Sequence, residues 1–186
     1  GQSIDAGREV VPLYEDVPGV GSDLARSLAV AAGVINLDVG ARVLHVLRLG
    51  YDTHAAQAAP LDALLRELDE ALDVFYDVLD PQFHSRTALA TLTEFGRRVH
   101  TNGALGTDHG TSSVMFVIGN RVKGGLYGTQ PSLTQLDERG DLAVTTDVRN
   151  VFATIVADWL HGDEQQVFGR TYPHLSLFRT GPTCAA

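Results

Sequence analysis

The sequence predicts an α/β protein with a mostly parallel sheet and helices on both faces. Ala41–Leu49 is a nearly continuous apolar run, which is typical of a strand covered on both sides. Thr87–Thr93 and Ser113–Ile118 are shorter strand candidates, and an amphipathic helix, Leu61–Leu79, follows the first strand. The order strand, helix, strand, loop, strand is that of a mostly parallel sheet with covering helices. Because three strands make a poor sheet, we expect the chain to be part of a larger one.

The composition excludes several classes of protein. The 186 residues are 44% hydrophobic and 20% charged, which is ordinary for a globular domain and argues against global disorder. The formal charge of −9 argues against sequence-independent binding of nucleic acid, which depends on Lys and Arg contacting phosphates. A single cysteine, Cys184, excludes an intrachain disulfide and a Cys-rich zinc site. No apolar run reaches the ~20 residues that span a bilayer.

Caps and periodicity predict the helices of the first half. Residues 1–21 lack periodicity and are expected to form an irregular lead-in. Ser22 or Asp23 is a suitable cap for a helix that follows the lead-in. Pro60 opens the amphipathic helix, in which leucines recur at helical spacing on one face and charged residues fill the other. This is the clearest helix in the sequence.

The second half is predicted to end in a helix and a tail. Gly119–Gly128 contains a pair of glycines and is typical of a turn or hairpin. Thr146 or Asp147 caps a last helix, Val148–Leu160. Residues 162–186 have no clear periodicity and are expected to be an irregular tail. The whole chain is therefore expected to be a single α/β domain.

Acidic and imidazole side chains follow the predicted strands. Asp52 and His54 follow the first strand, and Glu94 follows the second. Asp108 and His109 lie in a Gly-rich loop that enters the third. Ligands bind outside the carboxyl ends of the strands in an open α/β sheet, so these groups are expected to converge. Carboxylate with imidazole is the ligand set of zinc, manganese or iron, and the expected cofactor is therefore zinc or a similar divalent ion.

Two arginines beside this set are candidates for anion binding. Arg97 and Arg98 lie one helical step beyond Glu94, and either is able to clamp an anionic substrate in a bidentate contact. Arg97 is the candidate for a catalytic role. Structural alternatives stay open, because the arginines are also typical of a solvated helix start and of ion-pair partners for Glu94. Asp52 and His54 are likewise compatible with simply closing a turn.

Several segments together resemble domain-of-unknown-function family 1501, in the order of that family. These segments are Gly50–His54, Thr93–Arg98, Asn102–Gly103, Gly106–Thr111, Val122–Gly128 and Asp141–Asp147. They cover roughly the region Ala41–Leu160. The lead-in and the tail match no motif of that family.

The resemblance implies a fold and a metal centre. The family is regarded as a distant branch of the alkaline-phosphatase and sulfatase superfamily, which implies an α/β/α sandwich with metal at the carboxyl edge of the sheet. In that superfamily an Asp followed shortly by a His binds one metal, and Asp52 and His54 look like that pair. Glu94 resembles the acidic ligand at a strand end. His109, with Asp108 beside it, resembles the last ligand on a Gly-rich loop.

Two departures from the superfamily pattern bear on activity. The superfamily often shows Asp-His where this chain has Glu94-Phe95, so one ligand is lost or replaced. Its nucleophile and a first metal-binding Asp lie on an amino-terminal strand that this chain does not show. Full family members are longer and often carry a twin-arginine export signal. The resemblance therefore implies the carboxy-terminal part of a larger domain and a periplasmic or secreted location.

Two hypotheses of different classes follow. The first is a metal-dependent hydrolase of phosphate or sulfate esters that is catalytically incomplete as this fragment, with a nucleophile from a missing segment. Its partners would be a small anionic ester and the missing amino-terminal half or another chain, with no nucleic acid and no membrane span. The alternative is a non-catalytic binding or assembly module that keeps the alkaline-phosphatase-like fold. The replacement at Glu94-Phe95 and the absent nucleophile favour this alternative.

Overall fold

Residues 21–179 are described by the computed structural model, so the predicted lead-in lies outside the described residues except for its last position. The chain divides into two compact units. The first runs to Arg86 and also includes Asn102–Thr107. The second comprises Thr87–Thr101 and the residues from Asp108 onward. Within the described part, no helix combines the length and the apolar character needed to cross a membrane.

Helix α2, Asp23–Asn36, begins where its cap predicts. The Ser22 hydroxyl accepts a hydrogen bond from the Ala25 N–H at 3.1 Å, and Asp23 in the first turn complements the helix dipole. One face of the helix is buried and consists of small or branched apolar residues. These are Leu24, Ala25, Leu28, Ala29, Ala31 and Ala32.

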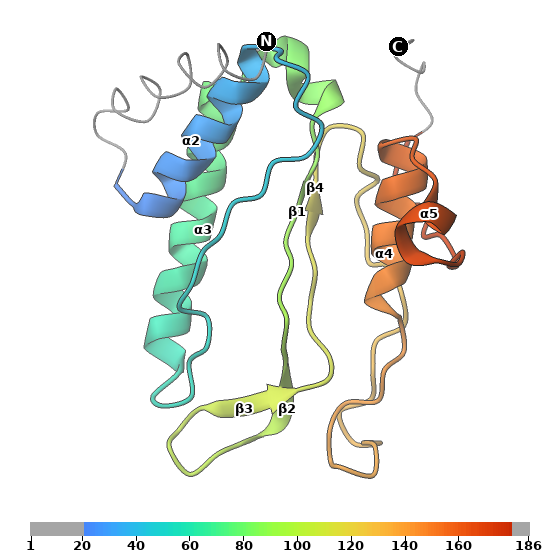
Figure 1. Ribbon diagram of the computed structural model, residues 1–186. Helices are drawn as coiled ribbons and strands as arrows, with labels where there is room; N and C mark the ends of the chain where they lie inside the picture. Colours follow the sequence, from blue (N-terminus) through green and yellow to red (C-terminus); the bar gives the residue numbers. More distant parts are fainter. Residues whose placement is uncertain (1–20, 180–186) are drawn as a thin grey trace. The chain divides into compact units, whose positions relative to one another are not determined.

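Helix α3, Ala58–Val78, lies beside α2 and completes the core of the first unit (Figure 1). Pro60 stands in its first turn, where its missing N–H breaks no intrahelical bond. Ala71, Phe75 and Leu79 are each exposed by 2% or less. The alanines of α2 take up little room, and Phe75 is the larger of the two buried side chains of α3.

The side chain of Asn36 also ties these two helices together. Its amide donates to the Val78 carbonyl at 2.8 Å and its oxygen accepts from the Asp80 N–H at 2.8 Å. One of the carbonyls left unpaired at the end of α3 is thereby satisfied. The chain continues directly into the 3₁₀ helix η1, Pro81–Arg86.

The predicted strand Ala41–Leu49 is not a strand in the structure. The segment is extended and runs beside α2 (Figure 1), where Leu44–Leu47 and one side of that helix line a shallow groove. Val43 and Leu49 are 71% and 70% exposed, which contradicts burial on both faces. The prediction is wrong because no strand among residues 21–179 pairs with this segment.

Two small two-stranded sheets stand in place of the expected parallel sheet. Strand β1, Leu89–Ala90, pairs antiparallel with β4, Val117–Ile118. Strand β2, Gly96–Thr101, pairs with β3, Thr107–Gly110, across a short hairpin turn. Parallel neighbours need a crossover of about a dozen residues or more, and this turn is far shorter. The α/β class therefore holds, whereas the large parallel sheet is not found in the described residues.

Glycines at two positions let the backbones of the hairpin approach closely. A Cβ at Gly96 would lie 2.1 Å from the Ser112 carbonyl oxygen, and one at Gly110 would lie 2.7 Å from that of Arg97. Arg97 and Arg98 belong to β2, so the structural alternative of a solvated helix start does not hold for them. A glycine immediately before them disfavours a helix and suits this close strand contact.

Helix α4, Val148–Thr154, is capped by Asp147, one of the two caps predicted. The carboxylate of Asp147 accepts from the Arg149 N–H at 2.9 Å. The Arg149 guanidinium also donates to this carboxylate, and that hydrogen bond lowers the pKa of Asp147 to about 2. The capping carboxylate therefore stays ionised, and its stabilising contribution is present above its ordinary pKa and lost as the pH falls through about 2.

The last five residues of this helical stretch, Ile155–Trp159, form a π-helical turn. The hydroxyl of Thr154 donates to the Asn150 carbonyl at 2.6 Å and accepts from the Leu175 N–H at 2.8 Å. A side-chain hydroxyl that hydrogen-bonds to a carbonyl of its own helix favours a local departure from α-helical geometry, such as this π turn. The same hydroxyl holds the following segment against the helix.

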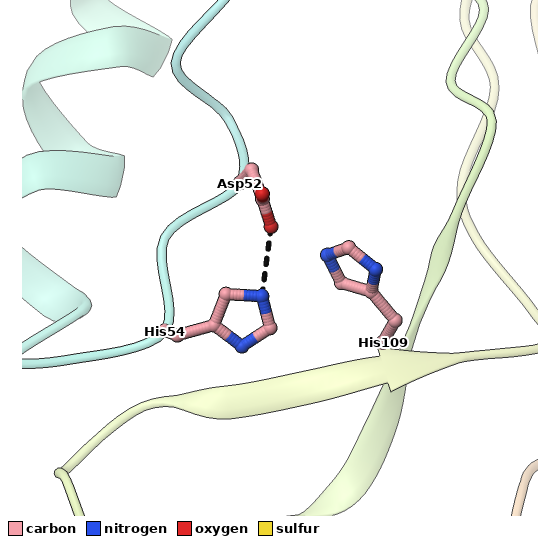
Figure 2. A group of neighbouring side chains, drawn as sticks. All are labelled: Asp52, His54 and His109. Carbon is pink, nitrogen blue, oxygen red and sulfur yellow. Dashed lines mark hydrogen bonds and ion pairs between the residues drawn. The ribbon is translucent and has the colours of Figure 1, made fainter.

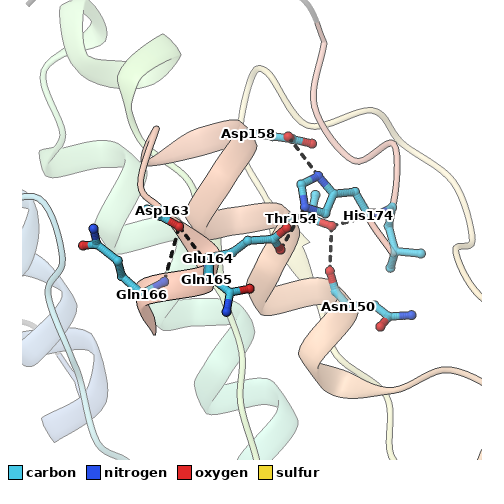
Figure 3. Close-up of polar contacts among 9 residues, drawn as sticks. Asn150, Thr154, Asp158, Asp163, Glu164, Gln165, Gln166 and His174 are labelled. Carbon is cyan, nitrogen blue, oxygen red and sulfur yellow. Dashed lines mark hydrogen bonds and ion pairs between the residues drawn. The ribbon is translucent and has the colours of Figure 1, made fainter. Parts of the chain in front are cut away.

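Helix α5, Glu164–Phe168, lies within the tail for which no periodicity predicted an element. Figure 3 shows how His174 connects this helix to the π turn. Its Nδ1 lies 3.3 Å from Asp158 Oδ1, and its Nε2 lies 3.1 Å from Glu164 Oε2. The hydrogen bond with Glu164, with the charge of Asp158, raises the pKa of His174 above its ordinary value, although burial acts in the opposite direction.

Replacing Glu164 with glutamine is expected to lower the pKa of His174 toward that of an exposed histidine, because its strongest partner loses its charge. The protonated imidazole makes these ion pairs. Their stabilising contribution is therefore complete below the ordinary pKa and is lost as the pH rises through the raised one. Titration of the imidazole resonances by NMR measures this directly. Glu138→Gln, an exposed change elsewhere in the second unit, is the control, and an unchanged titration in Glu164→Gln would contradict the assignment.

Candidate metal centre

The segment that carries Asp52 and His54 is anchored to helix α3. Arg48 forms an ion pair with Glu67 at 2.6 Å, and the Tyr51 hydroxyl donates to the Leu64 carbonyl at 3.1 Å. Gly50 lies between these anchors with φ of 106°, a conformation that suits glycine and turns the chain. Asp52 and His54 therefore follow directly after two residues, Arg48 and Tyr51, that are bonded to α3.

Asp52 and His54 contact one another directly. His54 Nε2 lies 2.8 Å from Asp52 Oδ1, as the dashed line in Figure 2 shows. Their side chains are 61% and 43% exposed, so the pair is open to solvent. The two residues are only two positions apart, and a backbone hydrogen bond from the Thr53 N–H to the Tyr51 carbonyl at 2.8 Å turns the chain at Asp52.

A hairpin turn from the same unit is docked on the residues that follow His54. The amide of Asn102 donates to the His54 carbonyl at 3.0 Å. The next two contacts are between backbones, from Ala56 N–H to the Ala104 carbonyl at 2.9 Å and from Gln57 N–H to the Leu105 carbonyl at 3.1 Å. Three consecutive polar contacts therefore fix this turn against the Asp52–His54 segment.

Gly106 is the point of closest approach between the turn and His54. A Cβ at this position would lie 2.2 Å from the His54 carbonyl oxygen, well inside contact distance. The side-chain oxygen of Asn102 accepts from the Gly106 N–H at 3.1 Å and from the Ala104 N–H at 2.9 Å, which shapes the turn internally. Only glycine fits here without moving one backbone away from the other.

His109 follows the docked turn within a few residues along β3. Thr107, the first residue of β3, donates its hydroxyl to Gln57 Oε1 at 2.9 Å, and His109 lies two residues further. Two extended residues span only about 7 Å, so His109 is separated from the docked turn by a very short stretch of chain. Figure 2 draws Asp52, His54 and His109 as neighbouring side chains, with one potential ligand atom from each within 4.8 Å of the others.

The chemistry of this group fits a transition metal ion. One carboxylate oxygen and two imidazole nitrogens are the mixed donor set of zinc, manganese or iron. Ligand atoms that share a tetrahedral zinc ion at ~2.0–2.2 Å lie about 3.3–3.6 Å apart. Binding a zinc ion would therefore require the side chains to rotate toward one another. Asp52, His54 and His109 would hold such an ion with three ligands, the number found in catalytic zinc sites.

Glu94 and Asp108 are not members of this three-residue group. Both side chains are exposed. Glu94 lies in the bend between Thr93 and Phe95, where the Thr93 hydroxyl donates to the Phe95 carbonyl at 3.2 Å. Asp108 lies on β3 directly before His109, and side chains of neighbouring strand residues point to opposite faces. Their role as ligands stays a prediction.

The two arginines have different surroundings. Arg98 forms an ion pair with Asp141 at 3.1 Å and donates to the Arg139 carbonyl at 2.6 Å, so it ties β2 to a later loop of the same unit. Arg97 instead lies over the ring of Phe95, with its guanidinium carbon 4.9 Å from the ring centroid. Arg98 therefore has a structural role, and contact of Arg97 with an anion stays a prediction.

Sequence reasoning missed residues that shape the site without being ligands. The ring of Phe95 is stacked on the imidazole of His109, with centroids 4.1 Å apart and planes at 6°. Asn102 and Gly106 hold the turn, as described above. The dipeptide Asn102-Gly103 between two strand-like runs is a known hairpin signal and was the available clue to this turn.

These features define an α/β protein with a solvent-exposed cluster of one aspartate and two histidines next to a docked hairpin turn. Comparison with family models identifies the particular family. Residues 22–173 match the family described as protein of unknown function (DUF1501), and the chain belongs to that family. Comparisons with curated proteins and with solved structures give no match.

Proposed function

We propose that the chain binds a divalent metal ion through Asp52, His54 and His109, as the metal centre of a hydrolase of phosphate or sulfate esters. The observation that carries the proposal is the proximity of three suitable ligand atoms, all within 4.8 Å of one another. The order of the motifs, which resembles that of the alkaline-phosphatase and sulfatase superfamily, supports the choice of substrate class. Glu94 and Asp108 are additional candidate ligands.

The chain's own residues supply the binding of the ester anion. When bound, the ion would polarise the ester oxygen. Arg97 carries a fixed positive charge on the hairpin strand that pairs with the His109 strand, and its planar guanidinium suits bidentate contact with phosphate or sulfate oxygens. The exposed side chains of Asp52 and His54 leave room for a small ester to approach.

We place the nucleophile outside this set of residues. None of the candidate side chains is a hydroxyl or thiol set beside a general base, which is the usual arrangement of an activated nucleophile. In the superfamily that the motifs resemble, the nucleophile lies on an amino-terminal strand, which supports a source outside these residues, and another chain is a second source. The chain by itself is therefore expected to bind metal and product anion without turning over the ester.

Replacing His54 with alanine is expected to weaken zinc binding by more than about 100-fold, since loss of a direct ligand exceeds the 10–100-fold effect of outer-shell partners. Isothermal titration of zinc into the full chain measures affinity and stoichiometry, and one ion per chain is expected for the wild type. His100→Ala is the matched control, because this histidine lies on the same hairpin outside the group. Equal affinity of wild type and His54→Ala would refute the site.

The hydrolase assignment has its own test. Inorganic phosphate and sulfate, the product anions, are expected to bind the zinc-loaded chain and not the metal-free one. Arg97→Ala should weaken that binding while leaving the zinc affinity unchanged. Zinc binding without any anion binding would keep the metal site and exclude the ester hydrolase.

A non-catalytic assembly module is the second candidate. The observation that favours it is the apolar, exposed surface of the extended segment, where Val43, Leu47 and Leu49 are 71%, 68% and 70% exposed. Surfaces of this kind are typical of contacts with other protein. Native mass spectrometry that shows stable oligomers, together with no zinc binding, would favour the module over the hydrolase.

A further inference from the structure

The imidazole of His109 lies face to face with the ring of Phe95. The planes differ by 6° and the centroids are 4.1 Å apart. Face-to-face contact covers the face of the imidazole and leaves its edge, where both nitrogens lie, accessible. A histidine binds metal through that edge. The contact therefore restricts rotation of the ring without occupying its ligand atoms.

The backbone on both sides of this stack is closely constrained. At Gly96, next to Phe95, the partner strand is so near that a Cβ would meet the Ser112 carbonyl at 2.1 Å. At Gly110, next to His109, a Cβ would meet the Arg97 carbonyl at 2.7 Å. Two glycines thus set the spacing of the strands, and the rings of the adjacent residues face one another as a result.

The same aromatic ring also holds an arginine. The guanidinium carbon of Arg97 lies 4.9 Å from the Phe95 centroid, within the range of a cation–π contact. Phe95 and Arg97 are two residues apart in extended chain, so their side chains lie on the same side. One ring is therefore in contact with both a candidate metal ligand and the candidate anion-binding group.

We propose that Phe95 is the positioning residue of the metal centre: it fixes the plane of the His109 imidazole for metal binding and holds the Arg97 guanidinium beside it. This inference rests on the proposed function, since it assumes that His109 is a ligand. On an exposed strand a histidine side chain would otherwise sample several rotamers, and binding would have to restrict them. Stacking restricts the ring before the metal arrives, which is the general origin of preorganised affinity.

The test compares Phe95→Leu with Phe95→Tyr. Leucine keeps an apolar side chain of similar bulk but has no ring, whereas tyrosine keeps the ring. Zinc affinity by isothermal titration is expected to fall about 2- to 10-fold in Phe95→Leu, the equivalent of one aromatic contact, and to stay near wild type in Phe95→Tyr. Phosphate binding to the zinc-loaded protein should fall in parallel in Phe95→Leu.

A second readout uses the metal-free protein. Protons above the face of an aromatic ring resonate upfield, so the His109 ring protons are expected upfield in wild type and Phe95→Tyr and at ordinary positions in Phe95→Leu. Equal zinc affinity in wild type and Phe95→Leu would overturn the positioning role and leave the metal site intact. A wild type that binds no zinc would refute the proposed function. If, in addition, the His109 ring protons of the wild type resonate at ordinary positions, the stacking on Phe95 is overturned as well. If they resonate upfield in the wild type and lose that shift in Phe95→Leu, the stacking is supported as a contact that orients the imidazole.

Discussion

Replacing Gly106 with alanine is expected to weaken metal binding by about ten-fold or more, although the residue is not a ligand. An added Cβ would lie 2.2 Å from the His54 carbonyl oxygen, so the turn and the Asp52–His54 segment must move apart by about 1 Å to reach ordinary contact. His109 follows that turn directly. A shift of this size exceeds the roughly 0.5 Å within which a binding constellation has to be held. Zinc titration of the full chain measures the loss.

Gly103→Ala is the matched control for this change. It lies in the same turn, and no atom lies within 4 Å of the position its Cβ would take. Zinc affinity of this variant should equal that of the wild type. If Gly106→Ala binds zinc as tightly as Gly103→Ala, the turn does not position the site. Circular dichroism of both variants separates a local displacement from loss of the fold.

Replacing Phe75 with alanine is expected to have the largest effect on stability, about 3–5 kcal/mol in the free energy of unfolding. The ring is only 2% exposed and belongs to α3, which packs against α2. Most of the other residues in this core are alanines. Their side chains are too short to fill the cavity that the truncated phenylalanine would leave. Urea unfolding followed by circular dichroism measures the change.

Leu65→Ala provides the comparison on the same helix. Leu65 is 47% exposed, so its truncation removes little buried area and should cost less than about 1 kcal/mol. Similar losses in the two variants would mean that the packing of α2 against α3 is not the main source of stability in the first unit. Zinc binding by Leu65→Ala should match that of the wild type.

The helices could be predicted because their signals are local. Ser22 caps α2, Asp147 caps α4, and the leucine spacing after Pro60 marks α3. Each of these depends on residues within one or two turns. The π-helical turn at the end of α4 could not be predicted in this way. It accompanies a hydrogen bond from the Leu175 N–H to the Thr154 hydroxyl, and Leu175 lies far beyond the helix in the sequence.

The sheet could not be predicted from apolar runs alone. The apolar run at 41–49 predicts a buried strand, but a run of this kind shows only that a segment is apolar and not which neighbours it has. In the structure it pairs with no strand of the described residues. At Arg97, helical spacing from Glu94 suggested a helix start, whereas Gly96 and its contact with Ser112 make it part of a strand.

The candidate site was partly accessible from the sequence. Asp52 and His54 are two residues apart, and that spacing is sufficient to place them together. The roles of Phe95 and Gly106 depend on what lies across the hairpin and beneath the turn, which are long-range relations. From the sequence, Phe95 is notable only because the superfamily often has a histidine at this position. Its stacking on His109 gives it a physical role that the sequence does not reveal.

X-ray absorption at the zinc edge of the loaded full chain tests the metal centre most directly. The account expects a first shell of nitrogen and oxygen at ~2.0–2.2 Å, with the outer-shell scattering of two imidazole rings. His109→Ala should reduce this to one ring, and His100→Ala should leave it at two. A spectrum without imidazole scattering, or one that His109→Ala leaves unchanged, would show that these residues do not bind the ion.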